Sequence, residues 1–195
     1  TPNDSAQYGY TSKTFTQRCR FDYKWDFCTR LVGAGIYGNA YIEKHKGVRI
    51  ENAFVKPFKS RDSFWRLPGE FEISSDSRRD VAVKATLTFD GVEVCSERMT
   101  VRLEPGSNSI ALPKDVENPL LWWTNGAGDQ PLYTYVVDIS ENGCTIASRS
   151  YRIAFRTFTY RRADGSADDS LPYLLEVNGK SVYLKGVNLV PYDLM

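Results

Sequence analysis

Residues 81–95 read Val81-Ala-Val-Lys-Ala-Thr-Leu-Thr-Phe-Asp-Gly-Val-Glu-Val-Cys95, and this stretch decides the fold class. From residue 81 to 89 apolar residues largely alternate with polar ones, which is typical of a β-strand with one buried face. Asp90-Gly91 follows, and this dipeptide favours a two-residue hairpin turn because both residues tolerate positive φ. The chain then returns through residues 92–95. The stretch therefore predicts an antiparallel hairpin.

The same pattern of short apolar runs and turn residues repeats along the chain. No stretch of a dozen residues keeps apolar residues at the three- and four-residue spacing of a helix. Strands spaced about ten residues apart are typical of an antiparallel sandwich of immunoglobulin type. We therefore predict an all-β protein whose immunoglobulin-like β-sandwich spans residues 45–158. Its further predicted strands are 48–55, 70–74, 99–103, 109–112, 133–139 and one from 144 to about 158, after an Asn142-Gly143 turn.

A long amphipathic stretch precedes this sandwich. Residues 15–27 place aromatic residues on one parity and charged residues on the other, which predicts a strand from a preceding sandwich within residues 1–44. The stretch ends in Trp25-Asp26, just before the glycine-rich residues 33–38. An aromatic ring can stack on a sugar while a neighbouring carboxylate accepts its hydroxyl hydrogen bonds. A packed tryptophan beside a solvated aspartate is the alternative, and the spacing leaves both open.

Residues 159–195 follow the sandwich. Residues 161–170 are charged and poor in apolar side chains, which favours a linker or exposed loop. Residues 173–177 and 182–184 then flank Asn178-Gly179 and predict one more hairpin. The chain starts without Met and shows no signal peptide, so we expect a processed or excised piece of a longer protein.

Composition excludes several classes of function. The 195 residues carry 25 basic and 24 acidic side chains, so a net charge of +1 gives no general attraction to nucleic acid or to an anionic membrane. No apolar run approaches the roughly 20 residues that span a bilayer. Four cysteines without metal-ligand spacing predict neither a zinc site nor a disulfide scaffold, and no cofactor is expected. Disulfide pairing stays open; we favour an extracytoplasmic compartment (periplasmic, secreted or lysosomal).

Four segments together resemble glycoside hydrolase family 2, and its β-mannosidase branch in particular. Residues 21–31 resemble the Trp-Asp motif that closes the N-terminal jelly roll, and residues 118–133 resemble a Trp-Trp stretch of the immunoglobulin-like domain. Arg152-Ile-Ala-Phe-Arg156 resembles the family's Arg-x-Gly-Phe-Arg signature, and residues 178–193 resemble the entry to its (β/α)8 barrel. The residues that depart from the family's pattern are Lys24, Phe27, Cys28, Thr29 and Leu189. Because Lys24 stands where the β-mannosidase branch usually has glycine, the resemblance does not specify the exact sugar.

This resemblance implies a function for the longer protein. It implies a retaining exo-β-glycosidase that hydrolyses terminal β-mannosides, with β-galactosidase and β-glucuronidase as alternatives. Trp25 would wall the −1 subsite and Asp26 would bind mannose hydroxyls. Asn188 and Asp193 lie where the first barrel strand would end, so they are weaker substrate-binding candidates; supporting the turn there is an equal alternative.

The same resemblance implies that this chain is not itself catalytic. A retaining glycosidase needs two carboxyl groups about 5 Å apart, and in this family both come from late barrel strands. We therefore expect no catalytic residue here; the glutamates of the sandwich read as solvated side chains. A stand-alone carbohydrate-binding module and a protein-interaction sandwich are the competing interpretations. We also expect the first 40 or so residues, as a jelly-roll end with open edges, to swap into a neighbouring molecule.

Overall fold

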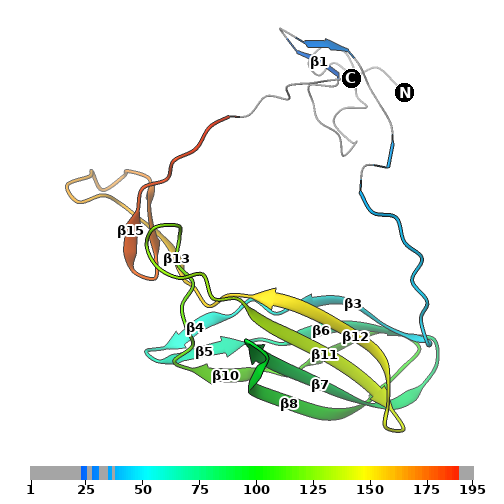
Figure 1. Ribbon diagram of the computed structural model, residues 1–195. Coiled ribbons are helices and arrows are strands. Elements are labelled where there is room, and N and C mark those ends of the chain that lie inside the picture. The colour runs from blue at the N-terminus through cyan, green and yellow to red at the C-terminus, as the bar shows by residue number, and fades with distance from the viewer. Residues whose placement is uncertain (1–22, 26–27, 31–34, 37, 189–195) are drawn as a thin grey trace. The chain divides into compact units, whose positions relative to one another are not determined.

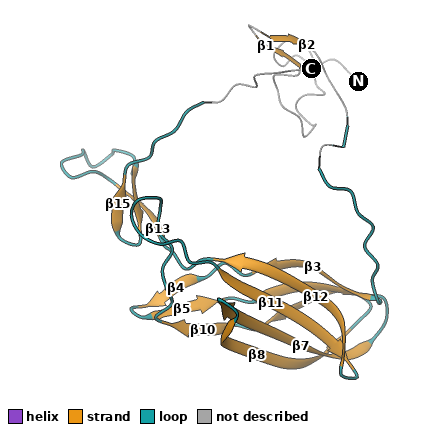
Figure 2. Ribbon diagram, viewed as in Figure 1, coloured by secondary structure: helices purple, strands orange, loops and turns teal. Residues whose placement is uncertain are grey.

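The computed structural model describes residues 23–25, 28–30, 35–36 and 38–188. The described part is all-β and contains no helix, as predicted (Figure 2). It divides into two compact units. The larger is Lys44–Leu184; the other holds the described residues among 1–43 and 185–195, including the ribbon of β1 (Tyr23–Trp25) and β2 (Cys28–Arg30). No helix of the described part is long and apolar enough to cross a membrane.

The larger unit is built on two facing antiparallel sheets (Figure 1). The four-stranded sheet has the order β12-β11-β7-β8, and the three-stranded sheet facing it has the order β3-β6-β9. A second three-stranded sheet, β10-β5-β4, continues this layer, and β13-β14-β15 form a separate sheet. The bounds of the strands in the two facing sheets are β3 Val48–Phe54, β6 Glu70–Ser75, β7 Arg79–Phe89, β8 Val92–Leu103, β9 Gly106–Ala111, β11 Tyr133–Glu141 and β12 Cys144–Ile153.

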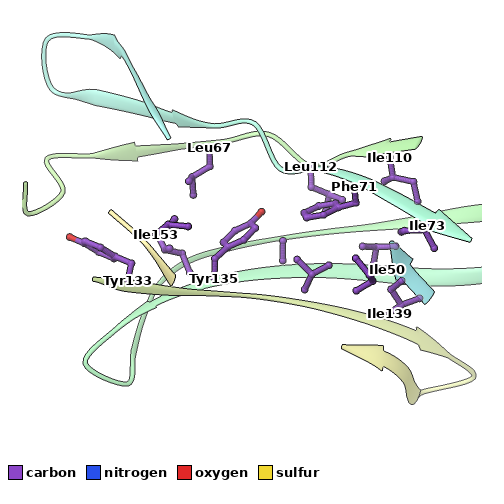
Figure 3. Close-up of a cluster of buried hydrophobic side chains, with 14 of the residues drawn as sticks. Ile50, Leu67, Phe71, Ile73, Ile110, Leu112, Tyr133, Tyr135, Ile139 and Ile153 are labelled. Atoms are coloured by element: carbon purple, nitrogen blue, oxygen red, sulfur yellow. The ribbon is translucent and has the colours of Figure 1, made fainter. Parts of the chain in front are cut away.

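The core lies between the facing sheets and follows from alternation along each strand. In β7 the residues Val81, Val83, Ala85 and Leu87 are buried and their neighbours are not. Figure 3 shows labelled side chains of both sheets pointing toward one another, with Phe71 on one side and Tyr135 on the other. Their rings stack at 6.4 Å between centroids. The period of two seen in the sequence is therefore the period of burial.

Three hairpins turn at the dipeptides that the sequence singled out. In each, an Asp or Asn with φ near +50° is followed by a glycine with φ near +80°, which suits a type I′ turn and the twist of its strands. The three pairs are Asp90-Gly91, Asn142-Gly143 and Asn178-Gly179.

The strand map differs from the prediction in three ways. The strand expected from residue 144 to about 158 ends at Ile153, and β13 (Phe158–Arg161) begins separately. Residues 92–95 and 99–103, expected as separate strands, form the single strand β8, and the polar residues between them are accommodated because β8 is a sheet edge. Three short strands were missed, since four residues give too little alternation to distinguish a strand from a loop. They are β4 Phe58–Arg61, β5 Phe64–Leu67 and β10 Lys114–Glu117.

The last sheet joins the end of the sandwich strands to the hairpin predicted near the C-terminus. It consists of β13 (Phe158–Arg161), β14 (Leu174–Val177) and β15 (Lys180–Val182), and residues 162–173 form the largely exposed loop expected there. Of the long strand predicted over residues 15–27, the structure describes only β1, and the remainder lies outside the described residues.

Candidate functional site

The Trp-Asp pair is only partly described. Trp25 ends β1, in keeping with its predicted place at a strand end, and its backbone pairs with Cys28 of β2. Asp26 lies outside the described residues. Of the two weaker candidates, Asn188 is exposed and outside any strand, and Asp193 lies outside the described residues. Their substrate-binding roles therefore stay predictions.

The described contacts near the start of β13 centre on the loop that contains Trp122 and Trp123. The Trp122 amide donates to the Phe155 carbonyl at 2.9 Å, and the Trp123 amide donates to the Asp129 carbonyl at 2.9 Å. A Cβ added at Gly128 would lie 2.8 Å from Cδ1 of Trp123, so only glycine permits this approach. The loop is thus fixed through its two tryptophans.

The Arg152–Arg156 stretch ties this loop to the core. Alternation turns Ile153 and Phe155 inward. The Phe155 ring is fully buried and meets the rings of Trp65 and Tyr133 edge-on, at 5.7 and 4.9 Å between centroids. Edge-to-face contacts between aromatic rings stabilise the core beyond the effect of the buried area, and they favour one orientation of the Phe155 ring. Because Arg156 is the next residue along, its backbone position is set by the core.

Asn178 fastens the terminal hairpin to the same place. Its Nδ2 donates to the Trp122 carbonyl at 2.9 Å, and its Oδ1 accepts from the Thr157 amide at 2.9 Å. Its own amide donates to the Thr157 carbonyl at 3.1 Å. Lys180, two residues on, lies over the Trp123 ring at 4.7 Å. One asparagine therefore joins three segments that are distant in sequence, and it does so from a turn position with φ of 51°.

Several charged groups of the sandwich form ion pairs on the surface. Lys114 Nζ lies 2.9 Å from Glu97 Oε2; this ion pair lowers the pKa of Glu97 and raises that of Lys114. Burial raises the pKa of the Cys95 thiol, which makes it a poor nucleophile. The glutamates expected to be solvated are exposed apart from half-buried Glu97: they are Glu70, Glu72, Glu93 and Glu104.

The described residues hold no cluster of three or more His, Cys, Asp or Glu side chains placed to bind a metal ion. Asp164, in the exposed loop after β13, pairs with Arg161 at 3.0 Å. The described contacts join the Trp122 loop, the Arg152–Arg156 stretch and the terminal hairpin into one frame.

Two features of this frame were missed from the sequence. The Asn178-Gly179 dipeptide marked a turn, but its side-chain contacts to residues 56 and 21 positions earlier left no local signal. The cation–π contact of Arg156 with the Trp122 ring was also not predicted, although both residues lie in motifs identified in the sequence.

Comparison with known proteins places the chain in a family. The family model of the glycosyl hydrolases family 2 matches residues 48–156, more than half of the chain. The chain belongs to glycosyl hydrolases family 2. The matched range of the chain contains both the Trp122 loop and the Arg152–Arg156 stretch.

Curated relatives from the family cover nearly the whole chain. Beta-mannosidase A of Aspergillus niger is 27% identical over 98% of the chain, and Beta-mannosidase A of Aspergillus terreus is 26% identical over 95%. The Capra hircus beta-mannosidase is 22% identical over 96%. The chain spans only about a fifth of the length of these relatives, 22–23%.

Solved structures share the fold. The beta-D-mannosidase of Dictyoglomus thermophilum superposes with a TM-score of 0.81 over 100% of the chain and 23% of its own length, at 20% identity. A family 2 beta-glucuronidase gives a TM-score of 0.60 over 72% of the chain and 15% of its own length, at 16% identity. A putative beta-galactosidase from Bacteroides fragilis gives 0.56 over 71% and 19%, at 17% identity.

Proposed function

We propose that this chain is the non-catalytic part of a retaining exo-β-mannosidase, which removes terminal β-linked mannose from saccharides. The observation that carries the proposal is the extent of the likeness to β-mannosidases. These relatives match 95–98% of the chain, including the segments on both sides of the sandwich. Among the solved structures, the beta-D-mannosidase covers 100% of the chain, whereas the beta-glucuronidase and the beta-galactosidase cover 71–72% of it.

In this proposal the three parts have distinct tasks. Residues 1–44 belong to a jelly roll and supply Trp25 and Asp26 to the sugar pocket, where the ring stacks on the pyranose and the carboxylate accepts hydroxyl hydrogen bonds. Residues 45–158 form the spacer. Residues 159–195 start a catalytic barrel, with Asn188 and Asp193 as weaker candidates at its rim. The matched length, about a fifth of each relative, supports the view that the catalytic glutamates lie elsewhere in the protein.

The fold of the described unit supports the spacer role. Its core is complete in itself, and its hydrogen-bonded junction at Asn178 fixes where the next sheet begins. A spacer of this kind would hold Trp25 and Asp26 at a constant distance from the reacting carboxylates. Such positioning is worth large factors in rate, since catalysis depends on the geometry of the bound sugar.

A panel of aryl glycosides tests this function. The full-length protein and the 195-residue chain are each assayed on aryl β-mannoside, β-galactoside and β-glucuronide. We expect the full-length protein to hydrolyse the mannoside at least about a hundredfold faster than the other two, a gap in kcat/KM of about 3 kcal/mol. We expect the chain alone to be inactive. Preference for a galactoside or glucuronide would refute the mannosidase assignment, and activity of the chain alone would refute its non-catalytic role.

A further inference from the structure

A groove outside the predicted sugar pocket joins apolar walls to an all-cationic rim. It lies where the connection after β3 passes the end of β12, and its volume is about 380 Å³. Phe54 and Phe158 form its walls with 52% and 46% of their surfaces exposed, which is unusual for phenylalanine in a well-packed sandwich. The residues that complete the lining are Ala53, Val55, Lys56, Pro57, Arg152, Ile153, Ala154 and Arg156.

The charge of this groove has one sign. Its three ionisable lining residues, Lys56, Arg152 and Arg156, are all basic, and none forms an ion pair with another described residue. Glu70 pairs with Phe54 in the strand register but is not among the lining residues. An apolar groove with an unbalanced positive rim complements a partner that carries an acid beside an apolar side chain.

Arg156 is the cation of the three that contacts aromatic rings of the described part. Its Cζ lies 4.3 Å from the centroid of the Trp122 ring and 4.9 Å from that of Phe158. The side chain is half-buried, yet it makes no hydrogen bond to any acceptor among the described residues. Ring contacts engage the faces of a guanidinium and leave its N–H donors available for a carboxylate, which it can bind through two parallel hydrogen bonds.

The fold explains why Arg156 is held in place. Ile153 and Phe155 turn into the core, so alternation directs Arg152, Ala154 and Arg156 to the groove side. Trp122 is fixed in turn by two hydrogen bonds: its amide donates to the Phe155 carbonyl, and its carbonyl accepts from Asn178 Nδ2. The guanidinium is therefore positioned before any partner arrives, which lowers the entropic cost of binding.

We propose that this groove docks a segment of a partner polypeptide that presents an aspartate or glutamate next to an aromatic or aliphatic residue. The carboxylate binds Arg156, and the apolar side chain enters between Phe54 and Phe158. Lys56 and Arg152 at the rim increase the rate of encounter rather than fix the geometry. The proposal is independent of the glycosidase activity.

The test uses a matched pair of dipeptide probes on the 195-residue chain. Acetyl-aspartyl-phenylalanine amide carries the carboxylate, and acetyl-asparaginyl-phenylalanine amide lacks it. Arginine Nε–H and backbone amide resonances are followed by NMR during titration. We expect the aspartyl probe to shift the Arg156 Nε–H saturably, with a Kd on the order of millimolar, and the asparaginyl probe to bind at least about tenfold more weakly. Equal binding of the two probes, or no saturable shift at Arg156, would overturn the proposal.

Variants confirm the location. Arg156→Gln should abolish the difference between the two probes, and Arg156→Lys should reduce it, because an ammonium lacks the planar pair of donors. Arg98→Gln, at an exposed arginine on β8 outside the groove, should bind as the wild type does. Should Arg156→Gln fail to fold, Phe54→Ser on the exposed wall serves instead and should weaken the aspartyl probe several-fold. Unchanged binding in the folded groove variants would contradict the proposal, as would shifts at Arg156 that depend on protein concentration alone and so reveal self-association.

Discussion

The sandwich core and the β13-β14-β15 sheet are both all-β, yet they are held in opposite ways. In the core, apolar residues of both facing sheets are buried together, and Phe155 is fully inaccessible. In the terminal sheet only Leu175 and Val177 are buried, while Phe158 and Tyr160 remain exposed. The sandwich is therefore stabilised mainly by burial, and the terminal sheet is attached through a few directed contacts around Asn178.

In the proposed function this difference matters because the terminal sheet would be where the chain leaves the spacer. A self-sufficient core can keep its shape while the attached sheet responds to what binds it. Substitutions in the core and in the terminal sheet should therefore differ in their effects on stability.

Phe155→Ala should cause the largest loss of stability. It removes a fully buried ring that contacts Trp65 and Tyr133, and we expect the free energy of unfolding to fall by about 3–5 kcal/mol. Urea denaturation of the 195-residue chain measures this. The matched control is Phe158→Ala, at a half-exposed ring of the terminal sheet, which should cost less than about 1 kcal/mol. Equal losses for the two variants would mean that the regions are not distinct.

Asn178→Ala should loosen the terminal sheet while leaving the core intact. It removes two side-chain hydrogen bonds and places alanine at positive φ, a combined local cost of about 2 kcal/mol. Hydrogen exchange should show faster exchange in β14 with β11 unchanged. Asn178→Gly relieves the backbone strain but not the lost bonds, so it should give an intermediate rate. Faster exchange throughout β11 would show that the two regions unfold as one.

Two core tyrosines offer a finer test of polar burial. The Tyr135 hydroxyl is buried and has no hydrogen-bond partner among the described residues, so Tyr135→Phe should raise the free energy of unfolding by about 1 kcal/mol. The Tyr133 hydroxyl accepts from the Leu120 amide at 2.8 Å, so Tyr133→Phe should lower it by a similar amount. Thermal melts of both variants check the opposite signs; a loss in both would contradict this account.

Tyr135 also predicts sensitivity to alkali. Burial raises the pKa of Tyr135 from its ordinary value of 10.0 to about 12. A folded pKa above the unfolded one gives stability that is complete below about pH 10 and is lost as pH rises toward 12. Tyr135→Phe lacks this ionisation, so its advantage over the wild type should widen across that interval. A constant difference would exclude the mechanism.

The smallest effect is expected at the half-buried ion pair of Lys114 and Glu97. Because the pKa of Glu97 is lowered below 4.5, the pair stabilises the fold above that pH and ceases to do so as pH falls through the lowered pKa. Glu97→Gln should therefore shift the urea midpoint down slightly at pH 7 and converge with the wild type in acid. Glu117→Gln, at an exposed residue outside any ion pair of the described part, is the control and should show no such convergence.

Much of the sandwich could be predicted because its alternation is local. The β7–β8 turn at Asp90-Gly91 is fixed by neighbouring residues, and so is the burial of Val81 and Val83. The role of Asn178 could not be predicted, because its partners lie far away in sequence. The Trp25-Asp26 pair was identified from its place at a strand end, but only the resemblance favoured its sugar-binding role, since nothing local distinguishes a sugar-binding tryptophan from a packed one.

The most direct test of the proposed function is the kinetics of Asp26→Ala in the full-length protein on an aryl β-mannoside, with Asp22→Ala as a nearby carboxylate control. We expect kcat/KM to fall for Asp26→Ala by one to several kcal/mol of transition-state binding, a factor of about five to several thousand, while the control stays near wild type. Wild-type kcat/KM in Asp26→Ala would contradict a role for this carboxylate in the sugar pocket and would leave only family membership standing.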